Sequence, residues 1–101
     1  WVGTATNPDG TFNYGAVRFT VRGATVRNFV IEGVTTDCGY MSLVMDSMKI
    51  KGNRFAGAYQ PVKDIDQIIV VNATVKGRTV TGTFSSGPLC GAEGAFSARA
   101  R

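Results

Sequence analysis

Hydrophobic and polar side chains alternate with a period of two along much of this chain. Residues 17–22 (Val-Arg-Phe-Thr-Val-Arg) alternate without interruption, and residues 80–84 and 94–101 do so with smaller side chains. A period of two places successive side chains on opposite faces of a β-strand, one face toward a core and one toward water. β-branched and aromatic residues dominate these runs, as is typical of half-buried strands. The pattern therefore predicts a chain built from β-strands.

Clusters of turn-forming residues separate the expected strands. These clusters are Asn7-Pro8-Asp9-Gly10, Gly23-Ala24, Gly52-Asn53, Lys76-Gly77-Arg78 and Ser85-Ser86-Gly87-Pro88. Gly52-Asn53 and Lys76-Gly77-Arg78 each predict a tight hairpin. Turn signals at intervals of about 8–12 residues are typical of a β-sandwich or barrel. We predict one domain over residues 1–101, an all-β antiparallel sandwich (immunoglobulin-like) or flattened barrel of about eight strands.

Three segments need separate interpretation. Residues 25–32 carry large apolar side chains at both parities, which indicates either a β-bulge near Arg27-Asn28 or a strand buried on both faces. The Met-rich residues 39–47 form a strand or one helical turn, and residues 59–65 are expected to be a connecting loop. The side chains expected to point inward are Val17, Phe19, Val21, Val26, Ile50, Phe55, Val80, Phe84, Phe96 and Ala98.

The chain contains two cysteines, Cys38 and Cys90, and no histidine. Two isolated cysteines in a short β-rich chain indicate one structural disulfide and an oxidising compartment. In the chain-entropy model, a bridge closing such a loop stabilises the fold by roughly 4 kcal/mol. A reactive Cys90 thiol is the less favoured interpretation. Two cysteines cannot complete a tetrahedral zinc site, and we expect no metal or other cofactor.

Several short motifs follow one another along the chain. They are Trp1-Val2-Gly3, Gly23-x-x-Val26-x-x-Phe29, Ile50-Lys51-Gly52-x-x-Phe55, Val80-Thr81-Gly82-Thr83-Phe84 and Cys90-Gly91-x-x-Gly94-x-Phe96-Ser97-Ala98-Arg99. Their order resembles the small exported β-sandwich domains of many actinobacterial and related secreted proteins. The resemblance implies the fold, export and the disulfide; that family has no established activity, so it implies no site. Phe96 stands where Trp is common, and the Met-rich segment after Cys38 is unusual.

Charge and hydropathy narrow the class of partner. The net charge is +4, without a dense basic run, so we do not expect a nucleic-acid partner. No apolar stretch reaches the roughly 20 residues that span a bilayer, so membrane insertion is not expected. Because the sequence starts at Trp1, without a signal-like segment, we interpret it as a mature product whose export signal has been removed.

Catalytic motifs are weak. Without histidine, the usual Ser-His-Asp and Cys-His devices cannot form, and the seven acids show no pairing suited to glycoside hydrolysis. Asp64-x-Asp66 could contribute to a calcium site, although two solvated loop acids are the simpler interpretation. Asn72-Ala73-Thr74 matches the N-glycosylation pattern but falls within an expected strand.

Two sets of residues are candidates for ligand binding. The first is basic: Arg18 and Arg22 (with Thr20), Lys49 and Lys51, and Arg99 and Arg101. If their strands are neighbours, they form a patch for an anionic glycan or an acidic protein; the alternative, which we favour from the sequence, is protection of strand edges. The second is aromatic: Trp1, Tyr14, Tyr40 and Tyr59 could stack on a neutral glycan, although packing at the core or rim is the favoured interpretation.

From these observations we expect a secreted, non-enzymatic binding or structural module, in the extracellular medium or at the cell surface. The alternatives are a carbohydrate-binding module, a self-assembling filament or surface-layer subunit that pairs through its last strand, and an inhibitor-like ligand presenting residues 57–66.

Overall fold

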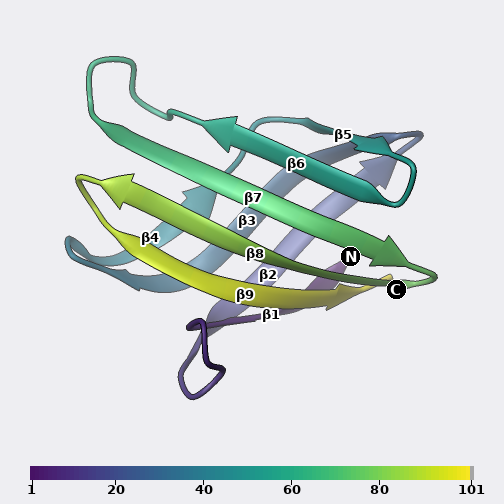
Figure 1. Cartoon of the computed structure of the whole chain (residues 1–101), viewed down its shortest axis with the longest axis horizontal. Helices are drawn as coiled ribbons and strands as arrows, with labels where there is room; N and C mark the ends of the chain where they lie inside the picture. The colour runs from purple at the N-terminus through teal and green to yellow at the C-terminus, as the bar shows by residue number, and fades with distance from the viewer. Residues whose placement is uncertain (101) are drawn as a thin grey trace.

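The computed structural model describes residues 1–100, which form nine β-strands and no helix (Figure 1). The strands are β1 (Val2–Thr6), β2 (Asn13–Arg22), β3 (Thr25–Thr36), β4 (Gly39–Val44), β5 (Met48–Lys51), β6 (Arg54–Tyr59), β7 (Gln67–Lys76), β8 (Thr79–Pro88) and β9 (Ala92–Arg99). All of their pairings are antiparallel. The all-β prediction is therefore confirmed. Arg101, expected on the last strand, lies outside the described residues.

Eight of the strands close into a barrel. Their hydrogen-bonded order is β2-β1-β9-β8-β7-β6-β5-β3, and β3 returns to β2. β4 stands outside this cycle, because it pairs only with the part of β3 that lies beyond β5. The molecule is flattened, with extents of 35 × 32 × 17 Å, and β6 to β9 cross in front of β2, β3 and β4 in Figure 1. The strands form one continuous sheet, so the hydrogen bonding does not divide them into the two sheets of an immunoglobulin-like sandwich.

The core is filled by alternate side chains of the closed strands. Eight of the ten residues expected to point inward are buried, and the other two, Val21 and Ile50, pack against the core while partly exposed. Phe29 lies at the centre: its ring centroid is 5.6 Å from that of Phe19 and 5.4 Å from that of Phe96. The alternation read from the sequence therefore located most of the core.

β3 contains the bulge that its mixed parity predicted. Arg18 pairs with Val30 and Thr20 with Arg27, so two steps along β2 match three along β3. The extra residue is accommodated at Asn28, whose φ of 55° is the only positive value at a non-glycine residue among those described. The bulge brings both Val26 and Phe29 inward, and both are buried. Of the two interpretations of this segment, the bulge is therefore confirmed.

The Met-rich segment forms β4 and the connection to β5, and contains no helical turn. Met45 and Met48 are buried beside Gly57 of β6, where a Cβ atom would lie 2.8 Å from Met48 Cγ. Both predicted hairpins are present, at Gly52-Asn53 and Gly77-Arg78, and residues 60–66 form the expected loop between β6 and β7. β4 raises the strand number above the expected eight.

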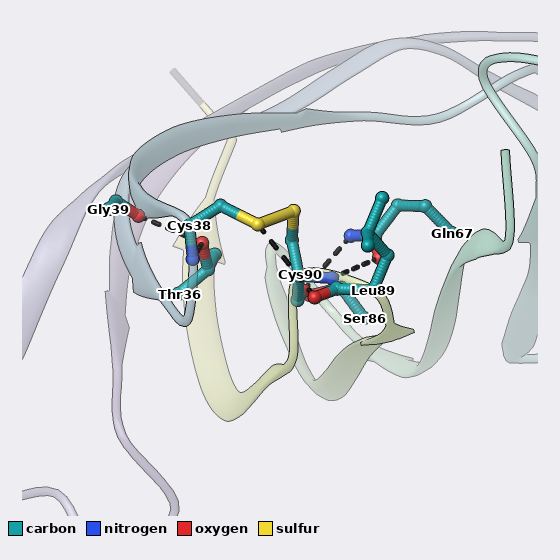
Figure 2. The surroundings of a disulfide bond; sticks show 7 residues. All are labelled: Thr36, Cys38, Gly39, Gln67, Ser86, Leu89 and Cys90. Carbon is teal, nitrogen blue, oxygen red and sulfur yellow. Dashed lines mark hydrogen bonds between the residues drawn. A yellow bond between two sulfur atoms is a disulfide. The ribbon is translucent and has the colours of Figure 1, made fainter.

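The predicted disulfide joins Cys38, in the β3–β4 turn, to Cys90, in the β8–β9 loop, with the Cα atoms 5.2 Å apart (Figure 2). The buried side chain of Gln67 holds Cys90 from both sides, because Cys90 N donates to Oε1 at 2.8 Å and Nε2 donates to Cys90 O at 3.0 Å. The Ser86 hydroxyl donates to the same carbonyl at 2.8 Å. The bridge therefore lies in a polar network that fixes the β8–β9 loop on the start of β7.

Seven of the eight connections gather at two ends of the barrel, because every pairing is antiparallel; the β4–β5 connection, residues 45–47, instead runs alongside β3. One end carries residues 7–12, the β3–β4 turn, residues 60–66 and the β8–β9 loop; we call it the disulfide end. The opposite end carries the tight turns β2–β3, β5–β6 and β7–β8, together with Trp1 and Ala100; we call it the hairpin end (Figure 1). The side chains exposed at these two ends differ in charge and in polarity.

Candidate functional site

Basic side chains gather at the hairpin end. The group consists of Arg22, Lys49, Lys51, Arg54, Lys76, Arg78 and Arg99, all of them exposed, and we call it the basic ring. It follows the ends of β2, β5, β6, β7 and β9, and it contains no acid. Among residues 1–100 one ion pair is formed, between Arg18 and Glu32, and it lies outside the ring.

Strand pairing fixes the spacing within the basic ring. Lys51 lies directly opposite Arg54 across the β5–β6 hairpin. Thr25 of β3 pairs with Arg22 on one side and Lys49 on the other. Since adjacent strands lie about 4.8 Å apart, bases on either side of one strand are about 10 Å apart. That separation is about one Debye length at 0.1 M salt, so these charges repel one another, and a bound anion would relieve the repulsion.

A shallow depression lies within the ring over β5 and β6. It is lined by Lys49, Lys51, Arg54, Phe55 and Ala56 and has a volume of about 420 Å³. The small Ala56 side chain leaves the space, and the three bases face it. A guanidinium beside two ammonium groups suits carboxylate, sulfate or phosphate groups, because Arg binds such groups through two parallel hydrogen bonds and Lys supplies a point charge.

The basic residues expected from the sequence lie as follows. Arg22, Lys49, Lys51 and Arg99 belong to the ring, whereas Arg18 pairs with Glu32. Thr20 lies away from the ring, where its hydroxyl donates to the backbone oxygen of Arg27 at 3.3 Å. The sequence did not single out Arg54, Lys76 and Arg78, which flank or occupy the two hairpin turns. Their positions beside those turns were the signal available in the sequence.

Protection of strand edges does not explain the ring. Every strand that carries one of its members has hydrogen-bonded neighbours on both sides. The only strand with a single neighbour among those described is β4, whose six residues include no charged side chain. Charge and free edge are therefore found on different strands.

The four candidate aromatic residues do not share one exposed face. Trp1 stacks on the buried Phe19 with ring centroids 5.6 Å apart, and Tyr14 and Tyr59 pack against the core. Tyr40 alone is largely exposed, at 79%. The arrangement therefore offers no platform on which several sugar rings could stack.

An apolar hollow opens at the disulfide end. Its lining residues are Met41, Pro61, Val62, Ile65, Gln67, Leu89 and Cys90, and its volume is about 220 Å³. Val62, Ile65 and Leu89 are 52%, 40% and 57% exposed and lie together here, as a patch rather than as scattered residues. Leu89 N donates to Asp66 O at 3.1 Å and holds the two loops of the hollow together. The sequence interpretation missed this feature.

Other candidate chemistry is sparse among the described residues. No three or more His, Cys, Asp or Glu side chains are grouped so that they could hold a metal ion, and Asp64 and Asp66 are both exposed. Asn72 is exposed on β7. Hydrogen bonds from the hydroxyl and amide of Thr11 hold the pKa of Asp9 below its usual value. No helix in residues 1–100 is long and apolar enough to cross a membrane.

Comparison of the chain with protein-family models, curated proteins and solved structures finds no match. The basic ring and the apolar hollow are therefore the features of the molecule from which a function can be inferred.

Proposed function

We propose that this chain is an exported, non-enzymatic binding module that holds an acidic polysaccharide against the basic ring. The observation that carries the proposal is the group of seven exposed bases at one end of the barrel, without an ion-pair partner among the described residues. The strands that carry these bases have neighbours on both sides, so protection of a free edge does not account for the group as a whole. A surface that accumulates like charge is destabilised by self-repulsion and attracts a polyanion.

The ring suits a polymer better than a small anion. Its members follow the rim of the barrel, and the depression over β5 and β6 is open. A chain bearing regularly spaced carboxylate or sulfate groups could meet several bases at once, and such linked contacts raise the effective affinity although each exposed pair contributes little.

Export is part of the same proposal. The Cys38–Cys90 disulfide is compatible with an oxidising compartment, and the resemblance to small exported β-domains supports the same location. An acidic polysaccharide of a cell wall or outer surface is a partner that such a compartment offers.

Titration with polygalacturonate, followed by calorimetry, tests the proposal. We expect binding that weakens steadily as sodium chloride is added, and no binding to neutral dextran. The double variant Lys51→Ser/Arg54→Ser is expected to lose about tenfold in affinity. Lys63→Ser, which removes one base from the disulfide end, is the control and should bind as the unmodified protein does.

Two results would overturn the proposal: absence of binding at low salt, or an equal loss of affinity in Lys63→Ser and in the double variant. The first would show that the ring does not recognise a polyanion. The second would show that net charge alone, rather than the ring, attracts it.

A further inference from the structure

The outer edge of β4 is free and uncharged. β4 pairs only with β3, and its sequence, Gly-Tyr-Met-Ser-Leu-Val, carries neither the Lys nor the Pro that commonly protects an exposed edge. Tyr40 and Val44 on this strand are 79% and 50% exposed. An unprotected edge of this kind is a template for an added strand.

The direction of the backbone groups on β4 can be assigned. Met45 N donates to Phe29 O at 3.1 Å, so this amide faces β3. Amides alternate in direction along an antiparallel strand, and those of Val44, Ser42 and Tyr40 therefore face away from β3. Three N–H groups, with their carbonyl groups, are thus presented along the free edge.

The apolar hollow lies next to this edge. Met41 of β4 lines it, opposite Val62 and Leu89. In a strand added beside β4, the side chains on the inner face would lie next to Met41 and Leu43. One such side chain, if large and apolar, would enter the hollow and cover the exposed parts of Val62 and Leu89. Edge and hollow together therefore specify an extended segment with an apolar anchor.

The surrounding charge specifies the rest of that segment. Asp37 and Asp46 flank β4, and Asp64 and Asp66 lie in the loop that forms one wall of the hollow; all four are exposed. The edge and the hollow are built from residues 34–48, 57–75 and 84–98. Besides the four acids, these ranges contain one further acid, Glu93, and one base, Lys63. This otherwise basic chain is therefore locally acidic here, and Lys or Arg residues on the added segment would complement it.

A second copy of β4 fits less well. The outward amides belong to Tyr40, Ser42 and Val44, so an antiparallel copy would place Ser42 opposite Ser42 and Tyr40 opposite Val44. In that register Asp37 and Asp46 of the added copy follow the ends of its β4, so the copy brings further acids and no base to surroundings that are already acidic. The basic ring of another copy could not fill the hollow either, because all of its members are Lys or Arg and none offers a large apolar side chain.

We propose that the outer edge of β4 and the adjoining apolar hollow bind an extended segment of another polypeptide. That segment carries apolar residues at alternate positions, one of which enters the hollow, and Lys or Arg residues near its ends. The proposal is independent of polysaccharide binding at the opposite end of the barrel.

Panning a random library of short linear peptides against the immobilised, disulfide-intact chain tests the proposal. We expect enriched sequences in which apolar residues alternate and basic residues lie near the ends. In the unmodified protein, a synthetic enriched peptide should slow hydrogen exchange at the Tyr40, Ser42 and Val44 amides. In Ser42→Pro, which removes one outward N–H without touching the β3 ladder, the affinity should fall at least about tenfold.

Ser42→Ala is the matched control and should retain the affinity, because it keeps the backbone amide. Leu89→Lys places a charge at the hollow outside the strand, so it tests the anchor even if Ser42→Pro fails to fold; it should also weaken binding. Lys51→Ser should bind the peptide normally, which separates this site from the basic ring. The proposal is overturned by an absence of enrichment, by equal binding to the Pro and Ala variants, by unchanged exchange at the edge amides, or by a concentration-dependent dimer formed through β4.

Discussion

Lys51 and Arg54 lie directly opposite each other across the β5–β6 hairpin, with both side chains exposed. Directly opposed like charges destabilise a strand pair, and no acid forms an ion pair with either residue among those described. The hairpin therefore contains an unfavourable pair that a bound anion would convert into a favourable contact. Because the pair is unfavourable in the unbound protein, it points to a binding role for the two bases rather than a structural one.

The variant Lys51→Thr should be more stable and bind polyanions less tightly. Thr places a β-branched side chain on the strand and removes the repulsion, so we expect a gain of about 0.2–1 kcal/mol in the free energy of unfolding, measured by urea denaturation. The affinity for polygalacturonate should fall severalfold at the same time. Lys63→Thr should change neither quantity by a comparable amount. A loss of stability in Lys51→Thr would contradict the repulsion on which the argument depends.

Removing the disulfide should destabilise the fold strongly. Cys38 and Cys90 are separated by 52 positions in the sequence, for which the chain-entropy model gives about 4 kcal/mol. We expect the double variant Cys38→Ala/Cys90→Ala to unfold at a much lower urea concentration than the unmodified protein. Adding a reductant should lower the midpoint of the unmodified protein toward that of the variant and leave the variant unchanged. Equal midpoints with and without reductant would show that the bridge contributes nothing.

Replacing Gln67 should destabilise the fold nearly as much as removing the disulfide does. The buried Gln67 side chain bonds both the amide and the carbonyl group of Cys90. Gln67→Met keeps a similar length but leaves the Cys90 N–H without its partner, so we expect a loss of about 1–3 kcal/mol in the free energy of unfolding. Gln60→Met is the matched control, because the Gln60 side chain also donates to two backbone carbonyl groups, Lys63 O at 3.1 Å and Ile65 O at 2.8 Å, but at an exposed position. A loss of similar size in both variants would contradict a special role for Gln67.

Local patterns in the sequence predicted individual strands more reliably than their closure into a barrel. The alternation in β2, β8 and β9 survives in the structure because each has one face in the core, and the bulge at Asn28 follows from the mixed parity of β3. Closure depends on β3 pairing with β2 on one edge and with β5 on the other. Such long-range pairing leaves no local trace, since each strand needs only an apolar face to satisfy its own pattern.

The candidate sites were predictable to a smaller extent. Bases that alternate with apolar residues, such as Lys49 and Lys51, could be assigned to an outer face, whereas Arg78 lies in a turn and has no such pattern. The apolar hollow was missed because Val62 and Ile65 belong to a segment that was expected only to connect two strands. Large apolar residues in a connecting loop are the signal that could have identified it, because loops that only connect are usually polar.

The bulge in β3 should depend on the residue that occupies position 28. Asn28 has a φ of 55°, a conformation that Gly and Asn tolerate and that β-branched residues strongly resist. We expect Asn28→Val to lower the free energy of unfolding by about 1–2 kcal/mol, because the Cβ atom crowds the backbone. Asn28→Gly should lie within about 1 kcal/mol of the unmodified protein, since relief of strain offsets the greater freedom of the unfolded chain. Arg27→Val, at the adjacent exposed position with an ordinary φ, is the control and should change stability little. If Asn28→Val were as stable as Asn28→Gly, the left-handed conformation would not be what orients Phe29 toward Phe19 and Phe96.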